Sequence, residues 1–196
     1  MHMGTAGKGR LITEAMNMIT KLDHRKKVVV LVGEPYSGKT TILRAIVEQE
    51  KKKYERRVVL LSSSPQLDPD LTVYENTLCP LLIDEVSKSA IRKRASRVLK
   101  ALDLDKVSNR YPHELTPDQQ VRASLARALI SEPDIVLIDE VPLRASSWRV
   151  LRSLQRKMGF TIVWTTHDMR KALKVGDRVL TIKRDRIELF RVEELN

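Results

Sequence analysis

Residues 27–41 read Lys-Val-Val-Val-Leu-Val-Gly-Glu-Pro-Tyr-Ser-Gly-Lys-Thr-Thr. After its lysine, the first part of this stretch is apolar and mostly β-branched without alternation, which predicts a strand buried on both faces over residues 27–32. Gly33 to Thr40 then fit the pattern G-x-x-x-x-G-K-[ST] in full. A helical pattern begins at Lys39. A strand, a glycine-containing loop and a helix in this order predict a phosphate-binding loop (P-loop).

Each residue type in the predicted P-loop has a physical reason. Glycines let successive backbone N–H groups converge on phosphate oxygens, and the helix N-terminus adds its positive dipole end. Lys39 supplies a charge for the β- and γ-phosphates of a nucleotide, and the Thr40 hydroxyl is a magnesium ligand. The alternative is a glycine-rich turn before a helix, without a ligand. The predicted nucleotide contacts are Gly33, Glu34, Pro35, Tyr36, Ser37, Gly38, Lys39, Thr40 and Thr41.

Strands and helices alternate outward from this loop. Apolar runs predict further buried strands, and helical spacing of apolar residues predicts the segments between them. The expected fold is α/β, with a mostly parallel sheet flanked by helices and a terminal hairpin. The predicted strands are residues 57–61, 135–138 and 160–165, with hairpin strands at 178–183 and 186–192; the predicted helices are 39–53, 72–102 with a break at Pro80, 117–130, 146–158, and one before the first strand carried by Leu11, Ile12, Ala15, Met16, Ile19 and Leu22.

Acidic residues and a histidine follow two of the later strands. Asp139 and Glu140 come directly after residues 135–138, at the carboxyl edge of the predicted sheet, where ligands of open α/β sheets bind. We expect Asp139 to hold magnesium through water and Glu140 to orient or deprotonate the attacking water. His167 follows the strand at 160–165 and is expected to sense the γ-phosphate by a hydrogen bond. The alternatives are a loop or helix cap for the acids and a capping turn with an incidental histidine.

The composition sets the broad class. A chain of 196 residues, 42% of them hydrophobic, predicts one domain over residues 1–196. The net charge of +11 favours polyanionic partners, although the basic residues are scattered among acids as on an ordinary solvated surface. Cys79 is the single cysteine, which excludes an internal disulfide and a multi-cysteine zinc site and favours the cytoplasm. The apolar runs are too short to span a bilayer, and no leader pattern opens the chain.

Four stretches carry a more specific pattern: Leu71-Thr-Val-Tyr-Glu-Asn76, Leu115-Thr-Pro-Asp-Gln-Gln-Val-Arg-Ala-Ser-Leu-Ala-Arg-Ala-Leu129, Glu132-Pro-Asp-Ile-Val-Leu-Ile-Asp-Glu140 and Thr165-Thr-His-Asp168. Together they resemble the nucleotide-binding subunit of the ATP-binding cassette (ABC) family, from about Val28 to Asp177. The resemblance implies ATP and Mg²⁺ as cofactors, with Asp139 as the magnesium-site aspartate, Glu140 as the catalytic glutamate and His167 as the switch histidine. It also implies a P-loop core with a helical subdomain inserted at about residues 71–111.

One segment departs from the family pattern. The family's signature LSGGQ completes the ATP site of the opposite subunit when two subunits close head to tail, whereas this chain has Leu115-Thr-Pro-Asp-Gln119. Thr116 keeps the hydroxyl, but Pro117 has no N–H to donate and Asp118 places a carboxylate where a phosphate contact is wanted, so we expect a weakened composite site. The residues alone also predict a capping box between Thr116 and Gln119, which explains the segment without a ligand.

Other family landmarks are altered or missing. Residues 141–146 lack the aspartate that usually ends the loop after the acidic pair, which puts communication between subunits in doubt. The magnesium-contacting glutamine is assigned to Gln66, although counting without gaps from Leu71 places Ser63 there. The segment before Lys27 does not resemble the family's antiparallel β-subdomain and offers no adenine-stacking aromatic, so base recognition is expected to be loose or supplied by another chain.

The leading hypothesis is an ABC-type ATPase that hydrolyses magnesium-ATP slowly and powers or regulates a partner. A membrane transporter subunit is the first option, because the family's helical arm docks on such a subunit; the protein would then be cytoplasmic and peripheral to the membrane. The alternatives are a nucleic-acid-associated P-loop ATPase, suggested by the charge and by basic clusters at residues 92–97 and 144–157, and a non-hydrolysing nucleotide-binding module that forms a homodimer. A small-molecule kinase is less favoured, since Glu140 and His167 suit activation of water.

Overall fold

The structure is a computed structural model that describes residues 5–21, 27–64, 66–81, 87–183 and 186–192. By their internal contacts these residues form two compact units. The first unit falls within residues 1–60, 134–140 and 159–196, and the second within residues 61–133 and 141–158. Among the described helices, none combines the length and the apolar character that crossing a bilayer requires.

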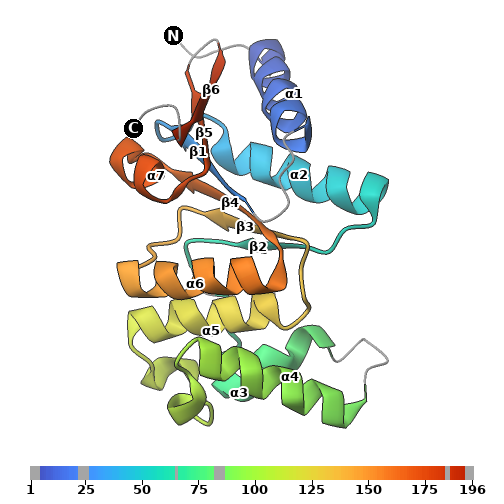
Figure 1. The fold of residues 1–196 in the computed structure, drawn as a ribbon, viewed down its shortest axis with the longest axis vertical. Coiled ribbons are helices and arrows are strands. Elements are labelled where there is room, and N and C mark those ends of the chain that lie inside the picture. Colours follow the sequence, from blue (N-terminus) through green and yellow to red (C-terminus); the bar gives the residue numbers. More distant parts are fainter. Residues whose placement is uncertain (1–4, 22–26, 65, 82–86, 184–185, 193–196) are drawn as a thin grey trace. The chain divides into compact units, whose positions relative to one another are not determined.

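A six-stranded sheet is the centre of the first unit, with the order β2-β3-β4-β1-β5-β6 (Figure 1). Strand β1 runs parallel to both β4 and β5, and β3 runs parallel to β4. Strands β5 and β6 pair antiparallel, which confirms the predicted terminal hairpin. The predicted mostly parallel sheet is therefore confirmed. The strands are β1 Val28–Gly33, β2 Val58–Leu61, β3 Ile135–Asp139, β4 Thr161–Thr166, β5 Arg178–Ile182 and β6 Ile187–Arg191.

Strand β2 differs from its prediction. Its β-branched run resembled the buried central strands, yet Val59 is half-buried and Leu60 is exposed. The cause is its place at one edge of the sheet, where β3 is its strand neighbour. Strand order depends on contacts far apart in the chain, so the local sequence did not reveal this exposure.

Helices cover both faces of the sheet in the first unit. Val29 and Leu31 belong to the buried cluster that contains the apolar residues of α2 (Lys39–Tyr54) and Ala15 and Ile19 of α1 (Thr5–Lys21). Val30 points to the opposite face, because side chains alternate along a strand, and its Cγ2 lies 2.8 Å from the position of a Cβ at Gly176, the C-cap of α7 (Met169–Val175). Helix α7 was not predicted. Leu22 of the predicted first helix lies outside the described residues.

The second unit is helical. Helix α3 (Val73–Leu78) leads into a 3₁₀ turn at Cys79–Leu81, so the predicted break at Pro80 is confirmed. Helices α3 and α4 (Lys88–Ala101) pack against α5 (Pro117–Leu129) around fully buried leucines such as Leu102 and Leu125. The unit also contains α6 (Ala145–Met158) and 3₁₀ turns at Asp105–Val107 and Pro112–Glu114. A single domain with an insertion at residues 71–111 stays a prediction.

Candidate functional site

The predicted P-loop joins β1 to α2 in the first unit, and two of its positions require glycine. Gly38 is the N-cap of α2 and has a φ of 96°, a conformation that side chains rarely adopt. A Cβ at Gly33 would lie 2.6 Å from Ser37 Oγ and 3.3 Å from Ile182 Cβ, so the loop could not close as tightly. Tyr36 also has a positive φ, of 64°, and is 97% exposed. The loop therefore has the tight, strained backbone that a phosphate cradle requires.

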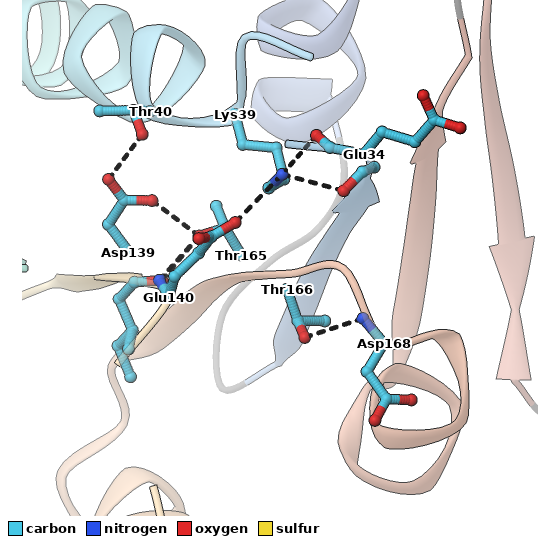
Figure 2. A network of polar contacts seen from close by, with 10 residues as sticks. Glu34, Lys39, Thr40, Asp139, Glu140, Thr165, Thr166 and Asp168 are labelled. Atoms are coloured by element: carbon cyan, nitrogen blue, oxygen red, sulfur yellow. Dashed lines mark hydrogen bonds and ion pairs between the residues drawn. The ribbon is translucent and has the colours of Figure 1, made fainter. Parts of the chain in front are cut away.

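Lys39 folds back over this loop. Its ammonium donates hydrogen bonds to the carbonyl oxygens of Gly33 at 2.9 Å and Glu34 at 2.8 Å. It also pairs with Glu140 Oε1 at 3.1 Å, as Figure 2 shows. The Lys39 side chain is only 5% exposed, whereas that of Glu140 is 46% exposed. A buried cation with three oxygen partners thus lies beside the loop that would receive phosphate.

Two of the residues expected to hold magnesium, Thr40 and Asp139, are in direct contact. The Thr40 hydroxyl donates to Asp139 Oδ2 at 2.8 Å, and the Thr165 hydroxyl donates to Asp139 Oδ1 at 2.8 Å (Figure 2). The backbone N–H of Glu140 donates to Thr165 Oγ1 at 3.0 Å. Thr165 of β4 therefore positions both acids at the end of β3, a role that the sequence did not predict. The register of the two parallel strands, with Asp139 opposite Thr165, explains this contact.

His167 lies just beyond the end of β4, in the turn before α7. Its side chain is exposed. The turn is held by the N–H of Asp168, which donates to Thr166 Oγ1 at 3.1 Å, and by the Asp168 carboxylate, which accepts from the Lys171 N–H at 3.1 Å. That hydrogen bond from the Lys171 backbone lowers the pKa of Asp168 below its ordinary value of 3.8. The structure places His167 at the same sheet edge as Asp139, and its role as a phosphate sensor stays a prediction.

A pocket of about 780 Å³ opens over the P-loop. Most of its lining comes from the P-loop and the first turn of α2, together with Glu140. Gly9 and Ile12 of α1 complete the described wall. The sequence predicted the helix but not its position beside the phosphate loop. In the described part of the chain no group of three or more His, Cys, Asp or Glu residues is placed to hold a metal ion.

The altered signature segment, in the second unit, has its own structural explanation. Thr116 Oγ1 accepts from the Gln119 N–H, and Gln119 Oε1 accepts from the Thr116 N–H at 2.9 Å, so the predicted capping box is confirmed. The Asp118 carboxylate accepts from Ser147 Oγ at 2.9 Å and pairs with Arg122 Nη2 at 2.8 Å. Both of its oxygens are engaged within the chain, and its side chain is 13% exposed. Asp118 thus connects α5 to α6.

Gln66 also lies in the second unit. Its backbone carbonyl accepts a short hydrogen bond from the Arg127 guanidinium, and the residue is exposed. Ser63, the alternative from ungapped counting, is exposed as well. The assignment of Gln66 as a magnesium ligand stays a prediction.

Comparisons with known proteins show which family the chain is similar to. A family model described as ABC transporter matches residues 18–142. The spermidine/putrescine import ATP-binding protein PotA of Photobacterium profundum is 33% identical over 182 residues, covering 82% of this chain and 49% of that protein. The protein of the same name from Vibrio cholerae is 30% identical over 194 residues, covering 88% of this chain and 51% of that protein. The chain thus spans about half the length of these curated relatives.

Solved structures show the same fold. CbiO1 from Clostridium perfringens, described as part of the ABC transporter complex CbiONQ, superposes with a TM-score of 0.77 at 21% identity, over 87% of this chain and 79% of its own. An ATP-binding subunit of an ABC transporter superposes with a TM-score of 0.72 at 18% identity, over 88% of this chain and 81% of its own. The predicted α/β P-loop fold is therefore confirmed.

Proposed function

Because the chain belongs to the ABC transporter family, we propose that it binds magnesium-ATP at the P-loop and hydrolyses it to power a membrane transporter subunit. The observation that carries this proposal is the polar network of Figure 2, in which Lys39 pairs with Glu140 and Thr40 with Asp139. Lys39, Thr40 and Glu140 also line one pocket. The names of the curated relatives, which are import ATP-binding proteins, support it. Activity, substrate and partner are all part of the proposal.

Phosphate binding follows from the loop and from Lys39. The backbone N–H groups at the N-terminus of α2 and the dipole of that helix attract the polyphosphate. The Lys39 ammonium, now paired with two carbonyls and Glu140, would exchange carboxylate for phosphate oxygen. This exchange frees the half-exposed Glu140 side chain. Glu140 would then orient a water molecule and accept its proton.

The residues present fit a magnesium ion. Thr40 Oγ1 and Asp139 Oδ2 lie 2.8 Å apart. Magnesium prefers oxygen ligands of this kind. When bound, the ion would neutralise charge on the β- and γ-phosphate oxygens. Thr165 holds Asp139 from the other side and fixes the orientation of its carboxylate. His167, at the end of the neighbouring strand, would donate a hydrogen bond to the γ-phosphate.

Removing the P-loop ammonium tests the proposal directly. In Lys39→Ala we expect magnesium-ATP binding, measured by calorimetry, to weaken at least tenfold and phosphate release to fall to background, because no other Lys or Arg of the described residues lines the pocket. Lys51→Ala, an exposed position on the same helix, is the matched control and should behave as the unaltered protein. Equal turnover in the unaltered protein and Lys39→Ala would refute an ATPase at this site.

The partner is proposed to be a membrane subunit on the cytoplasmic side, which places this chain at the membrane surface. When cells express the chain together with its transporter subunit, fractionation should find the chain with the membranes. In cells without that subunit, the chain should be absent from the membrane fraction. None of the relatives described above supports the nucleic-acid alternative.

A second candidate has a specific observation in its favour. Pro117 lacks an N–H, and both carboxylate oxygens of Asp118 are engaged by Ser147 and Arg122. A signature segment with these properties favours a nucleotide-binding module that does not hydrolyse. Binding of magnesium-ATP without phosphate release in the assay above would select this candidate.

A further inference from the structure

The pocket extends beyond the phosphate loop to a second wall. Its lining from Pro35 to Ile42 and Glu140 belongs to the phosphate end, where the loop amides and Lys39 are. Within the described residues, the rest of the lining is Gly9 and Ile12 of α1, a helix that packs beside α2 (Figure 1). With the triphosphate on the loop, the space that remains for the nucleoside lies along α1.

Gly9 and Ile12, the described residues of this second wall, form an apolar surface without an aromatic ring. Ile12 is partly buried and packs against the core cluster of the first unit. Gly9 is exposed, and a Cβ added there would meet nothing within 4 Å, so the helix presents bare backbone and open space at this point. The Gly9 carbonyl already accepts a hydrogen bond from the Thr13 hydroxyl at 3.0 Å. Neither Gly9 nor Ile12 has a side-chain hydrogen-bonding group for the edge of a base.

We propose that the nucleoside of a bound nucleotide packs against α1 at Gly9 and Ile12, so that the site selects the triphosphate and distinguishes adenine from guanine only weakly. Strong discrimination between bases needs polar groups that would be left unpaired by the wrong base, and an apolar wall has none. The inference rests on the proposed nucleotide-binding function and adds to it the part of the chain that contacts the nucleoside.

Tyr36 is the aromatic residue among the described residues that line the pocket. It lies within the phosphate loop, two residues before Gly38, and is 97% exposed. Its place in the loop assigns it to the phosphate end, so the inference predicts that Tyr36→Ala leaves the ratio of ATP to GTP affinity unchanged.

The test compares magnesium complexes of ATP, GTP and inorganic tripolyphosphate, with dissociation constants measured by calorimetry on the full chain. We expect ATP and GTP to bind within about threefold of each other. Ile12→Ala should weaken both about three- to tenfold, from the apolar contact that is lost, and leave tripolyphosphate unchanged. Met16→Ala is the matched control, because Met16 packs against the same core from the same helix without lining the pocket. It should leave all three affinities unchanged.

A second variant keeps the test decisive if Ile12→Ala unfolds. Gly9→Trp adds a side chain where the structure has open space, so the fold should tolerate it. The indole either fills the nucleoside space or stacks on the base, so it should change the affinities for ATP and GTP together at least threefold and leave that for tripolyphosphate unchanged. Three results would overturn the inference alone. They are a preference for ATP over GTP above about tenfold, variants of α1 that change the affinity for tripolyphosphate as much as those for ATP and GTP, and a Tyr36→Ala variant that loses affinity for ATP and GTP but not for tripolyphosphate. Failure of every triphosphate to bind the unaltered protein would overturn the proposed function with it.

Discussion

At the scale of single residues, the Lys39–Glu140 pair bears on two properties of the site: how the buried ammonium is stabilised, and how phosphate would bind beside it. A buried ammonium left without partners would be strongly unfavourable, and here two carbonyls and a carboxylate surround it. In the proposed function, phosphate oxygens would approach Lys39 beside the same carboxylate, which would compete with them for Lys39 and repel them. Glu140 would thus act against binding of the nucleotide before it acts on water.

Replacing Glu140 by glutamine separates these effects. We expect phosphate release by Glu140→Gln to fall at least a hundredfold, because the base is lost. The affinity for magnesium-ATP should stay the same or increase several-fold, because a negative charge beside the phosphates is removed. Turnover by phosphate release and affinity by calorimetry check the two parts. Loss of binding and turnover to the same extent would contradict the role given to Glu140.

At the scale of elements, short side-chain caps begin several helices. Thr116 and Gln119 cap α5, Thr72 and Glu75 cap α3 in the same way, and Asp168 caps α7. Such caps satisfy backbone N–H groups that have no partner within the helix. They explain why Thr-Pro-Asp-Gln can replace the family signature without loss of the α5 start.

The α5 cap can be measured by its removal. Thr116→Ala deletes the hydroxyl that accepts the Gln119 N–H, and we expect the free energy of unfolding to fall by about 1 kcal/mol. Urea denaturation monitored by circular dichroism gives this value. Thr116→Ser keeps the hydroxyl and should lose much less. A neutral Thr116→Ala would mean that the cap contributes nothing to stability.

The α7 cap should depend on pH. The Lys171 N–H lowers the pKa of Asp168, so the folded state binds the proton less readily than the unfolded state. The stabilisation is therefore present above the ordinary pKa of 3.8 and is lost as the pH falls through the lower folded value. Asp168→Asn keeps a capping oxygen that does not titrate in this range. The unfolding free energies of the two proteins, measured between pH 6 and pH 2, should converge toward low pH; a constant difference would be inconsistent with this cap.

Features of the fold and of the site could be predicted from the sequence where residues close together in the chain cause them. The β1 strand, the hairpin and the Thr116 capping box follow from residues close together in the chain, and all were predicted. Helix α7 has seven residues with only Ala172 buried, so its periodic signal is too weak to detect. Asp118 contacts Ser147 and Glu140 contacts Lys39, although the two residues of each pair are far apart in the sequence. Helix α1 likewise lies at a pocket whose other residues are distant from it in the chain. These depend on the folded topology and have no local pattern.

At the scale of the whole molecule, the resemblance to ABC subunits implies a composite site made by two chains. In that arrangement the backbone N–H groups of the signature segment contact the nucleotide of the opposite chain. Pro117 is the first residue of α5 and has no N–H, so one of these donors is missing in this protein. The capping hydrogen bonds use Thr116 and Gln119, which means that Pro117 can be replaced without removing the cap.

Restoring this donor should therefore strengthen the dimer. In a Glu140→Gln background, which retains ATP, we expect the chain to stay mainly monomeric with magnesium-ATP in sizing chromatography with light scattering. Pro117→Ala in that background adds the N–H, with a good helix former in place of proline, and should increase the ATP-dependent dimer at least several-fold. The same change in a Lys39→Ala background is the control and should give no dimer, since the phosphate cation is absent. A stable ATP-dependent dimer with Pro117 in place would show that the missing N–H does not limit closure.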